Sequence, residues 1–219
     1  MKDQVVHGQP SFLVANGDVS VAITKLGGHM APVTFGAGGR QQITPYYISP
    51  WQDEEHEEMP ADVLIPLRGD FFCMPFGGNA ASFNGEEHPV HGETATGLWS
   101  FVDEQSDESG LSRLQLELET HVREGRVTKE VFLREGHQVV YQRHTVDGFG
   151  GPTSVGHHAI LAMPDDVETL TISTSAFRLG MTNPGVFSDP ASGEYQLLAT
   201  GETFDDLKKI PTLLKDPAF

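Results

Sequence analysis

The sequence has little of several things, and each shortage excludes a class of protein. A single cysteine, Cys73, rules out an intrachain disulfide and a structural zinc site built from several cysteines. No stretch approaches the ~20 consecutive apolar residues that a membrane-spanning helix needs. The opening residues, MKDQVVHGQP, also lack the apolar run of a signal peptide, so we expect a cytoplasmic protein.

Basic residues are scarce as well. Lys and Arg number 14 against 31 Asp and Glu, which gives a formal net charge of −17 at pH 7. A negative field of this size repels nucleic acid and anionic membrane surfaces, so neither is expected as a partner. A neutral or cationic small molecule is the easier ligand.

Alternating apolar and polar residues predict an all-β fold. Hydrophobic residues make up 38 % of the 219 residues, enough to fill a core, and 24 glycines with 14 prolines suit short strands joined by turns. The residues at 19–24 and 169–173 alternate with a period of two, which is typical of antiparallel strands with one face in water. We therefore expect an antiparallel β-sandwich with little helix.

The second half of the chain adds a predicted meander. Three strands at 112–122, 126–133 and 138–146 are separated by turns that contain glycine, and 153–163 follows as a further strand. The only helical pattern is 205–214, which a proline interrupts.

Two long stretches, 44–66 and 76–96, show no regular pattern. Structureless loops longer than ~12–15 residues are uncommon in a compact domain and usually line functional sites. No repeat, linker or shift in composition divides the chain, so we expect one β-sandwich domain over 1–219.

Histidines are the main candidates for functional residues, because the sequence has ten of them against 14 Lys and Arg. The clearest cluster is EEHPVHGE at 86–93. The pair His157 and His158 opens an apolar stretch, and the segment PLRGDFF at 66–72 adds a basic and an acidic side chain.

In this order the pieces resemble the galactose mutarotase-like superfamily, which includes the aldose 1-epimerases. The family pattern is an Arg-containing segment, an Asn-rich stretch, a His-Gly pair followed by Trp, and later a strand histidine followed by apolar residues. The resemblance extends from about residue 11 to about residue 170. The matching stretches are GGHMAPV at 27–33, RGDF at 68–71, GN at 78–79, HG at 91–92, GLW at 97–99, VTKEV at 127–131 and GHHA at 156–159.

The resemblance implies a sandwich that binds a sugar in a cleft on one sheet and interconverts the anomers of an aldose. This reaction needs a base for the anomeric hydroxyl and an acid for the ring oxygen, and a histidine with its ordinary pKa of ~6.5 suits the acid. By resemblance, His158 is the acid and His91 is the second catalytic histidine. Arg68, Asn79 and His157 are the implied sugar-binding residues, and neither a metal nor a cofactor is implied.

The sequence departs from the family pattern at two places. His157 stands where the family usually has Asn, and because neighbouring strand residues point to opposite faces, only one of the two histidines can face the cleft. The apolar residues after His158 favour that one. The family's carboxylate base lies late in a longer chain and has no matching motif here. The chain is therefore a fragment, takes its base from elsewhere, or binds sugar without turnover.

Two other functions fit parts of the pattern. The segment HPVHGE at 88–93 places two histidines and a carboxylate close together, and His157 or His158 could complete a metal site of the cupin type. Cupins, however, separate their first two histidines by one residue, not by two that include proline. The other alternative is a non-catalytic carbohydrate-binding sandwich, which shares the fold and the cleft but lacks the base.

Several of these residues also have a purely structural interpretation. Arg68 could form a surface ion pair with Asp70, and a histidine that opens a buried strand is often a core residue. Trp99 is expected in the core, and Cys73 as a small buried side chain.

Overall fold

The computed structural model describes residues 4–39, 41–54, 58–79, 81–166, 170–186, 188–189, 191 and 193–213. The chain folds as two compact units, Met1–Met163 and Pro164–Phe219. Both large sheets lie in the first unit and a two-stranded sheet lies in the second; that residues 1–219 form one domain stays a prediction.

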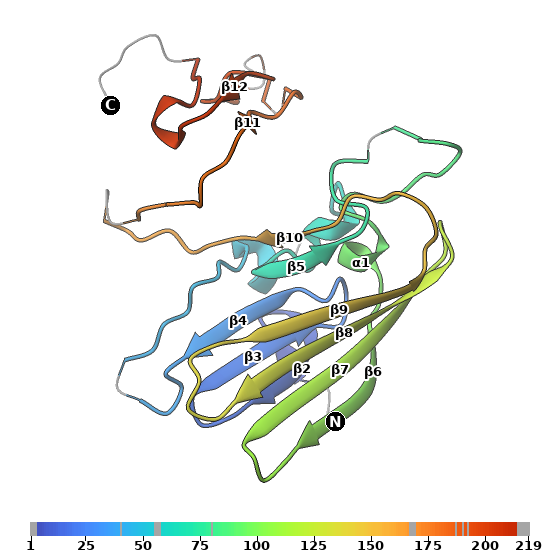
Figure 1. Cartoon of the computed structure of the whole chain (residues 1–219), viewed down its shortest axis with the longest axis vertical. Coiled ribbons are helices and arrows are strands. Elements are labelled where there is room, and N and C mark those ends of the chain that lie inside the picture. Colours follow the sequence, from blue (N-terminus) through green and yellow to red (C-terminus); the bar gives the residue numbers. More distant parts are fainter. Residues whose placement is uncertain are drawn as a thin grey trace. The chain divides into compact units, whose positions relative to one another are not determined.

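The first sheet has six strands, and each pairs with its neighbours in antiparallel fashion (Figure 1). The alternating pattern at 19–24 forms one of them, as predicted. In sheet order the strands are β1 (Gln4–Val6), β2 (Gln9–Ala15), β3 (Val19–Thr24), β4 (Met30–Phe35), β5 (Asp70–Cys73) and β10 (Gly156–Ala159).

The second sheet is a four-stranded meander, which confirms the prediction for this part of the chain. The last strand begins at Tyr141 rather than at residue 138, because its pairing with β8 ends at Phe132↔Tyr141 and the chain before it forms the turn closed by the His137 amide and the Arg134 carbonyl (3.0 Å). The strands are β6 (Ser100–Ser106), β7 (Leu111–Thr120), β8 (Gly125–Arg134) and β9 (Tyr141–Gly148).

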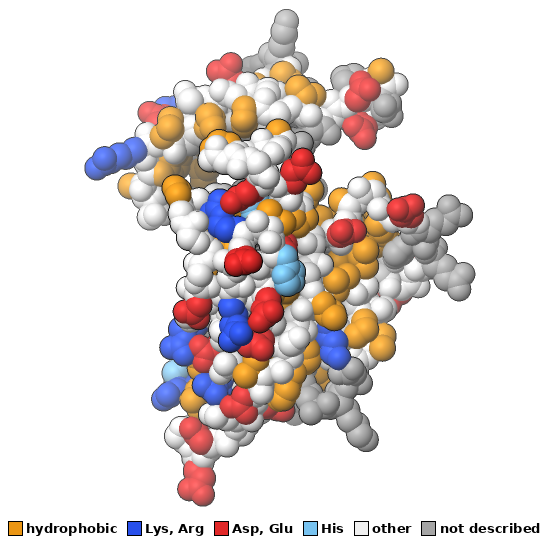
Figure 2. Space-filling model, turned by 90° about the vertical axis from the view of Figure 1, so that its right-hand side faces the viewer, with side chains coloured by type: hydrophobic (Ala, Val, Ile, Leu, Met, Phe, Trp, Pro, Cys, Tyr) orange, Lys and Arg blue, Asp and Glu red, His pale blue; other side chains and the backbone are white. Residues whose placement is uncertain are grey.

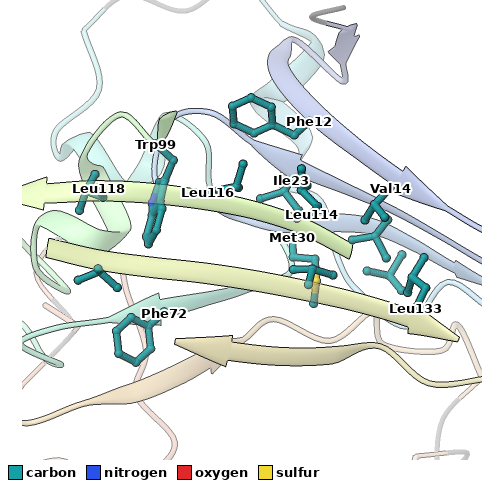
Figure 3. Close-up of a cluster of buried hydrophobic side chains, with 14 of the residues drawn as sticks. Phe12, Val14, Ile23, Met30, Phe72, Trp99, Leu114, Leu116, Leu118 and Leu133 are labelled. Carbon is teal, nitrogen blue, oxygen red and sulfur yellow. The ribbon is translucent and has the colours of Figure 1, made fainter. Parts of the chain in front are cut away.

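The two sheets pack face to face around one hydrophobic core, so the fold is the antiparallel β-sandwich that the sequence predicted. Every second residue of β7, from Leu114 to Leu118, is buried, and Val127 and Val131 of β8 point the same way. Figure 3 shows Leu114, Leu116 and Leu118 between the sheets. Other members of the core are Phe12, Val14, Ile23, Met30, Phe72, Trp99 and Leu133.

Helix is scarce in the described part of the chain, as predicted, and every helix there is short. In place of the predicted helix at 205–214 there is one 3₁₀ turn, whose start is capped by the Asp206 carboxylate (3.0 Å from the Lys208 amide); residue 214 lies outside the described residues. Among the described residues, no helix combines the length and apolar character needed to cross a bilayer. The described helices with given bounds are α1 (Glu93–Thr96) and the 3₁₀ turns η1 (Pro50–Asp53), η2 (Asp62–Leu64) and η4 (Leu207–Lys209).

Two predicted strands differ from the structure. The strand predicted at 153–163 is only β10, after which Ile160 and Ala162 hydrogen bond with the irregular segment at 45–47. Residues 170–173 form no strand, because Leu170 and Ile172 are 40 % and 69 % exposed and have no sheet face to cover; residue 169 is not among the described residues. The second unit instead holds β11 (Gly180–Met181) paired with β12 (Thr203–Phe204).

The short strand β5 has a buried side chain on each of its two faces. Phe72 belongs to the core between the sheets, whereas Phe71 and Cys73 point to the opposite face. There they meet Val63 of η2 and Ala95 of α1, which cover this part of the six-stranded sheet. A residue paired with β5 therefore faces either the core or this second cluster.

Charged side chains on the second sheet are paired with one another. On its outer face Arg113 lies 2.9 Å from Asp103 and 3.4 Å from Glu130, and Arg143 donates to Glu130 at 2.6 Å. Figure 2 shows acidic and basic side chains interspersed over one face of the molecule. The large net negative charge is thus not gathered into one acidic patch on this face.

Candidate functional site

The two adjacent histidines of β10 point to opposite faces, as the strand pattern predicted. His158 lies opposite Phe71 in the antiparallel register, and His157 lies opposite Phe72. Their ring partners agree: His158 stacks on Phe71 (centroids 4.8 Å apart), whereas His157 lies against Phe72 (5.7 Å).

His91 and His158 meet on the face that α1 and η2 cover. Their ring centroids lie 5.0 Å apart, with an angle of 68° between the rings. His91 also packs edge-on against Phe71 (5.9 Å) and Phe76 (5.3 Å). The Nδ1 atoms of both histidines are buried and have no hydrogen-bond partner among the described residues. The Nε2 atoms are therefore the ones that a ligand can reach.

The backbone holds His91 in an unusual conformation. Its φ is +62°, in the left-handed region, and its amide donates to the Gly77 carbonyl (2.9 Å) while its carbonyl accepts from the Met74 amide (3.2 Å). Gly92 follows with φ +81°, and a Cβ at that position would lie 2.0 Å from the Met74 carbonyl oxygen. The His-Gly pair is thus a tight fit against β5 and needs its glycine.

Electrostatics favour a neutral His91. Burial lowers its pKa, and the neighbouring His158 lowers it further, because two positive charges would repel each other. On the far side of Phe71, the fully buried His29 stacks at 3.9 Å and donates to the Ala95 carbonyl (3.0 Å). Burial lowers the pKa of His29 to about 3 despite that hydrogen bond, so this ring stays neutral too. His29 could not be assigned a role from sequence, because only the fold stacks its ring on Phe71.

Arg68 is fully buried and serves the backbone. Its guanidinium donates to the carbonyls of Val6 (2.9 Å), His7 (2.7 Å) and Pro66 (3.3 Å), and to the Gln52 side chain. The ion pair with Asp70 that the sequence suggested is absent within the described part of the chain, because that carboxylate has other partners. The structure shows Arg68 as an anchor of the N-terminal hairpin, and its sugar-binding role stays a prediction.

Asn79 also holds backbone. Its Nδ2 donates to the carbonyls of Pro75 (3.3 Å) and Pro89 (2.9 Å), so it closes the loop that precedes His91. Its sugar-binding role likewise stays a prediction.

A second polar cluster lies on the other face of β5 and β10. His157 Nδ1 lies 2.9 Å from Asp70 Oδ2, and Gln142 donates to the same oxygen at 2.7 Å. Burial would raise the pKa of Asp70, but these hydrogen bonds outweigh burial and lower it. Burial lowers the pKa of the nearby Lys129 to about 8 and that of His144 to about 2. The structure thus separates His157, a predicted sugar-binding residue, from His91 and His158.

The histidine and carboxylate side chains of the HPVHGE segment do not come together at one point. His88 contacts Glu86 (3.0 Å), whereas the Glu93 carboxylate accepts hydrogen bonds from the backbone amides of His121 and Val122 (3.0–3.1 Å). Within the residues that the structure describes, no group of three His, Cys, Asp or Glu side chains could hold a metal ion. This arrangement gives the cupin-like alternative no support.

The geometry defines an antiparallel β-sandwich with a pair of histidines on one sheet face. No protein-family model matches the chain, and no curated protein does. Among solved structures, the fold is similar to that of the Slr1438 protein from Synechocystis sp. PCC 6803, with a TM-score of 0.58 and 14 % sequence identity over 96 % of this chain and 69 % of that one. At this identity the likeness concerns the fold alone.

Proposed function

We propose that this protein binds an aldose against His91 and His158 and interconverts its α and β anomers. The observation that supports this function best is the approach of the two imidazoles to 5.0 Å on one sheet face. The resemblance to the aldose 1-epimerases assigns the same two histidines to catalysis.

The reaction itself explains why the two rings have to be close. Mutarotation removes a proton from the anomeric hydroxyl and adds one to the ring oxygen, and both oxygens are bonded to C1 of the sugar. Two catalytic groups that lie side by side can therefore reach both atoms at once. The ring opens, C1 rotates, and the reverse transfers close the ring on the other face.

The two histidines are suited to different roles. We assign the acid to His158, which donates a proton to the ring oxygen and recovers one when the ring closes. His91 is the candidate base, since burial and His158 lower its pKa and keep it able to accept the anomeric proton. In the described residues no carboxylate hydrogen bonds with either ring, so His91 would take the role that the family gives to a carboxylate.

Sugar binding without turnover is the second candidate. It is favoured by the same lack of a carboxylate beside the histidine pair among the residues described. The two candidates share the site and differ only in whether protons move.

Polarimetry with freshly dissolved α-D-glucose and α-D-galactose separates the two candidates. We expect His158→Gln and His91→Gln each to lower the catalysed rate by roughly 10²–10⁴, the range for losing a general acid or base, and His91→Glu to recover part of it. The matched control is His121→Gln, an exposed histidine whose side chain has no place in this pair.

Calorimetric titration with the same sugars completes the experiment. If the sugar binds but the rate of anomer interconversion does not exceed that in buffer, only the binding function is supported. If there is neither a rate nor binding, the proposed function is wrong.

A further inference from the structure

A second candidate site lies in a pocket of about 260 Å³ beside the loop that precedes His91. Neither His91 nor His158 lines it. The polar and aromatic residues around it are Asn79, Phe83, Glu86, His88, Arg123 and Ser154.

One wall of the pocket is a compensated pair of charges. Arg123 donates to both carboxylate oxygens of Glu86, at 3.0 Å and 2.6 Å. The same guanidinium donates to the Pro152 carbonyl (3.2 Å) and lies over the Phe149 ring (4.8 Å). Since the two charges neutralise each other, this wall favours neither an anion nor a cation.

His88 lines the pocket beside Glu86. Only 9 % of its side chain is exposed, and its Nε2 lies 3.0 Å from Glu86. Hydrogen bonds from Arg123, and then from His88, lower the pKa of Glu86 to about 2, so the carboxylate is ionised and His88 Nε2 carries the hydrogen of this contact. The other ring nitrogen, Nδ1, is buried without a partner among the described residues, so a ligand in the pocket does not reach it.

Two further side chains around the pocket have used their donors. Both hydrogens of the Asn79 amide go to backbone carbonyls, and the Ser154 hydroxyl donates to the Phe76 carbonyl (3.0 Å). Their oxygen atoms can only accept from a ligand. The pocket is therefore rich in acceptors and suits a molecule with several hydroxyl donors.

Phe83 supplies an apolar surface among the residues that line the pocket. Its side chain is 74 % exposed, on a two-residue turn in which Asn84 and Gly85 have φ of +52° and +81°. Reciprocal backbone hydrogen bonds of 3.0 Å between Phe83 and Glu86 close this turn. The face of an aromatic ring carries partial negative charge, which attracts the C–H bonds on one face of a sugar ring.

We propose that this pocket binds a single neutral pyranose ring, with sugar hydroxyls donating to the side-chain oxygens of Asn79 and Ser154 and the apolar face of the sugar against Phe83. A net charge of −17 disfavours an anionic ligand, and the Arg123–Glu86 pair leaves no free charge for a cation. Binding here does not need the anomeric hydroxyl, so the site is independent of the proposed reaction.

Methyl glycosides test the pocket without turnover, because their blocked anomeric oxygen prevents ring opening. The probes are the methyl α- and β-glycosides of D-glucopyranose and D-galactopyranose, and the readout is the NMR signals of the His88 ring and of the Phe83 and Ser154 amides. We expect at least one probe to shift these signals in a saturable way.

Matched variants then locate the binding. Phe83→Ala should weaken it by roughly 2–10-fold, and Ser154→Ala, which removes one acceptor, should weaken it by a similar factor. His158→Gln should leave it unchanged, as should Tyr195→Ala, which removes an exposed ring from the second unit.

The proposal is wrong if no probe shifts these signals. It is also wrong if the shifts follow His91 and His158, vanish in His158→Gln and persist in Phe83→Ala. A failure of the proposed epimerase function, by contrast, appears in polarimetry and leaves the glycoside shifts unchanged.

Discussion

Replacing Arg68 by methionine separates its structural role from a role in sugar binding. The substitution keeps the apolar stem and removes a buried guanidinium from four oxygen acceptors. The carbonyls of Val6 and His7 are only partly buried and can bond to water instead, whereas the Pro66 carbonyl and the Gln52 side chain lose a buried donor. At about 1–3 kcal/mol for each unsatisfied buried group, the free energy of unfolding should fall by about 2–6 kcal/mol.

Urea unfolding followed by circular dichroism measures this change as a lower midpoint at unchanged slope. The control is Arg126→Met, which breaks an exposed ion pair with Glu119 (3.2 Å) and should cost under about 1 kcal/mol. A loss below about 1 kcal/mol for Arg68→Met, together with a weakened affinity for sugar, would refute the structural argument and restore the sugar-binding interpretation.

Two further substitutions test the packing around β5. Gly92→Ala should destabilise the fold by about 1–3 kcal/mol and lower any epimerase rate, because the new Cβ would lie 2.0 Å from the Met74 carbonyl oxygen; thermal unfolding and polarimetry measure the two effects. Asp70 has a lowered pKa in the folded state, so its stabilising contribution is present above its ordinary pKa of about 3.9 and is lost as the pH falls through the folded value. Asp70→Asn should therefore remove part of the acid sensitivity of the urea midpoint between pH 6 and 3, and equal pH dependence in the two proteins would contradict this.

Local periodicity was enough to predict the sandwich and its meander. β7 and β8 are ten residues long, apolar residues alternate with polar ones over 114–118 of β7, and each strand is joined to the next by a short turn, so the pairing is local in sequence. The alternating pattern at 170–173 did not become a strand. A period of two predicts which side chains of a strand would be buried, but it does not tell whether another sheet is present to bury them.

The histidine pair was predictable in part. Strand geometry alone placed His157 and His158 on opposite faces, and the family resemblance joined His158 to His91. The buried role of Arg68 could not be predicted, since its partners Val6 and His7 lie 62 and 61 positions away in the sequence. The sequence alone does not distinguish an arginine that binds a ligand from one that binds backbone carbonyls, as Arg68 does.

The position of β10 at the end of the six-stranded order has a consequence for its two histidines. Among the described strands, β10 pairs with β5 alone, over four residues, so the placement of His157 and His158 depends on one strand pairing. On one face of β10, His157 hydrogen bonds with Asp70, and on the other face His158 stacks on Phe71. A change in the pairing of β10 with β5 would therefore move both histidines together.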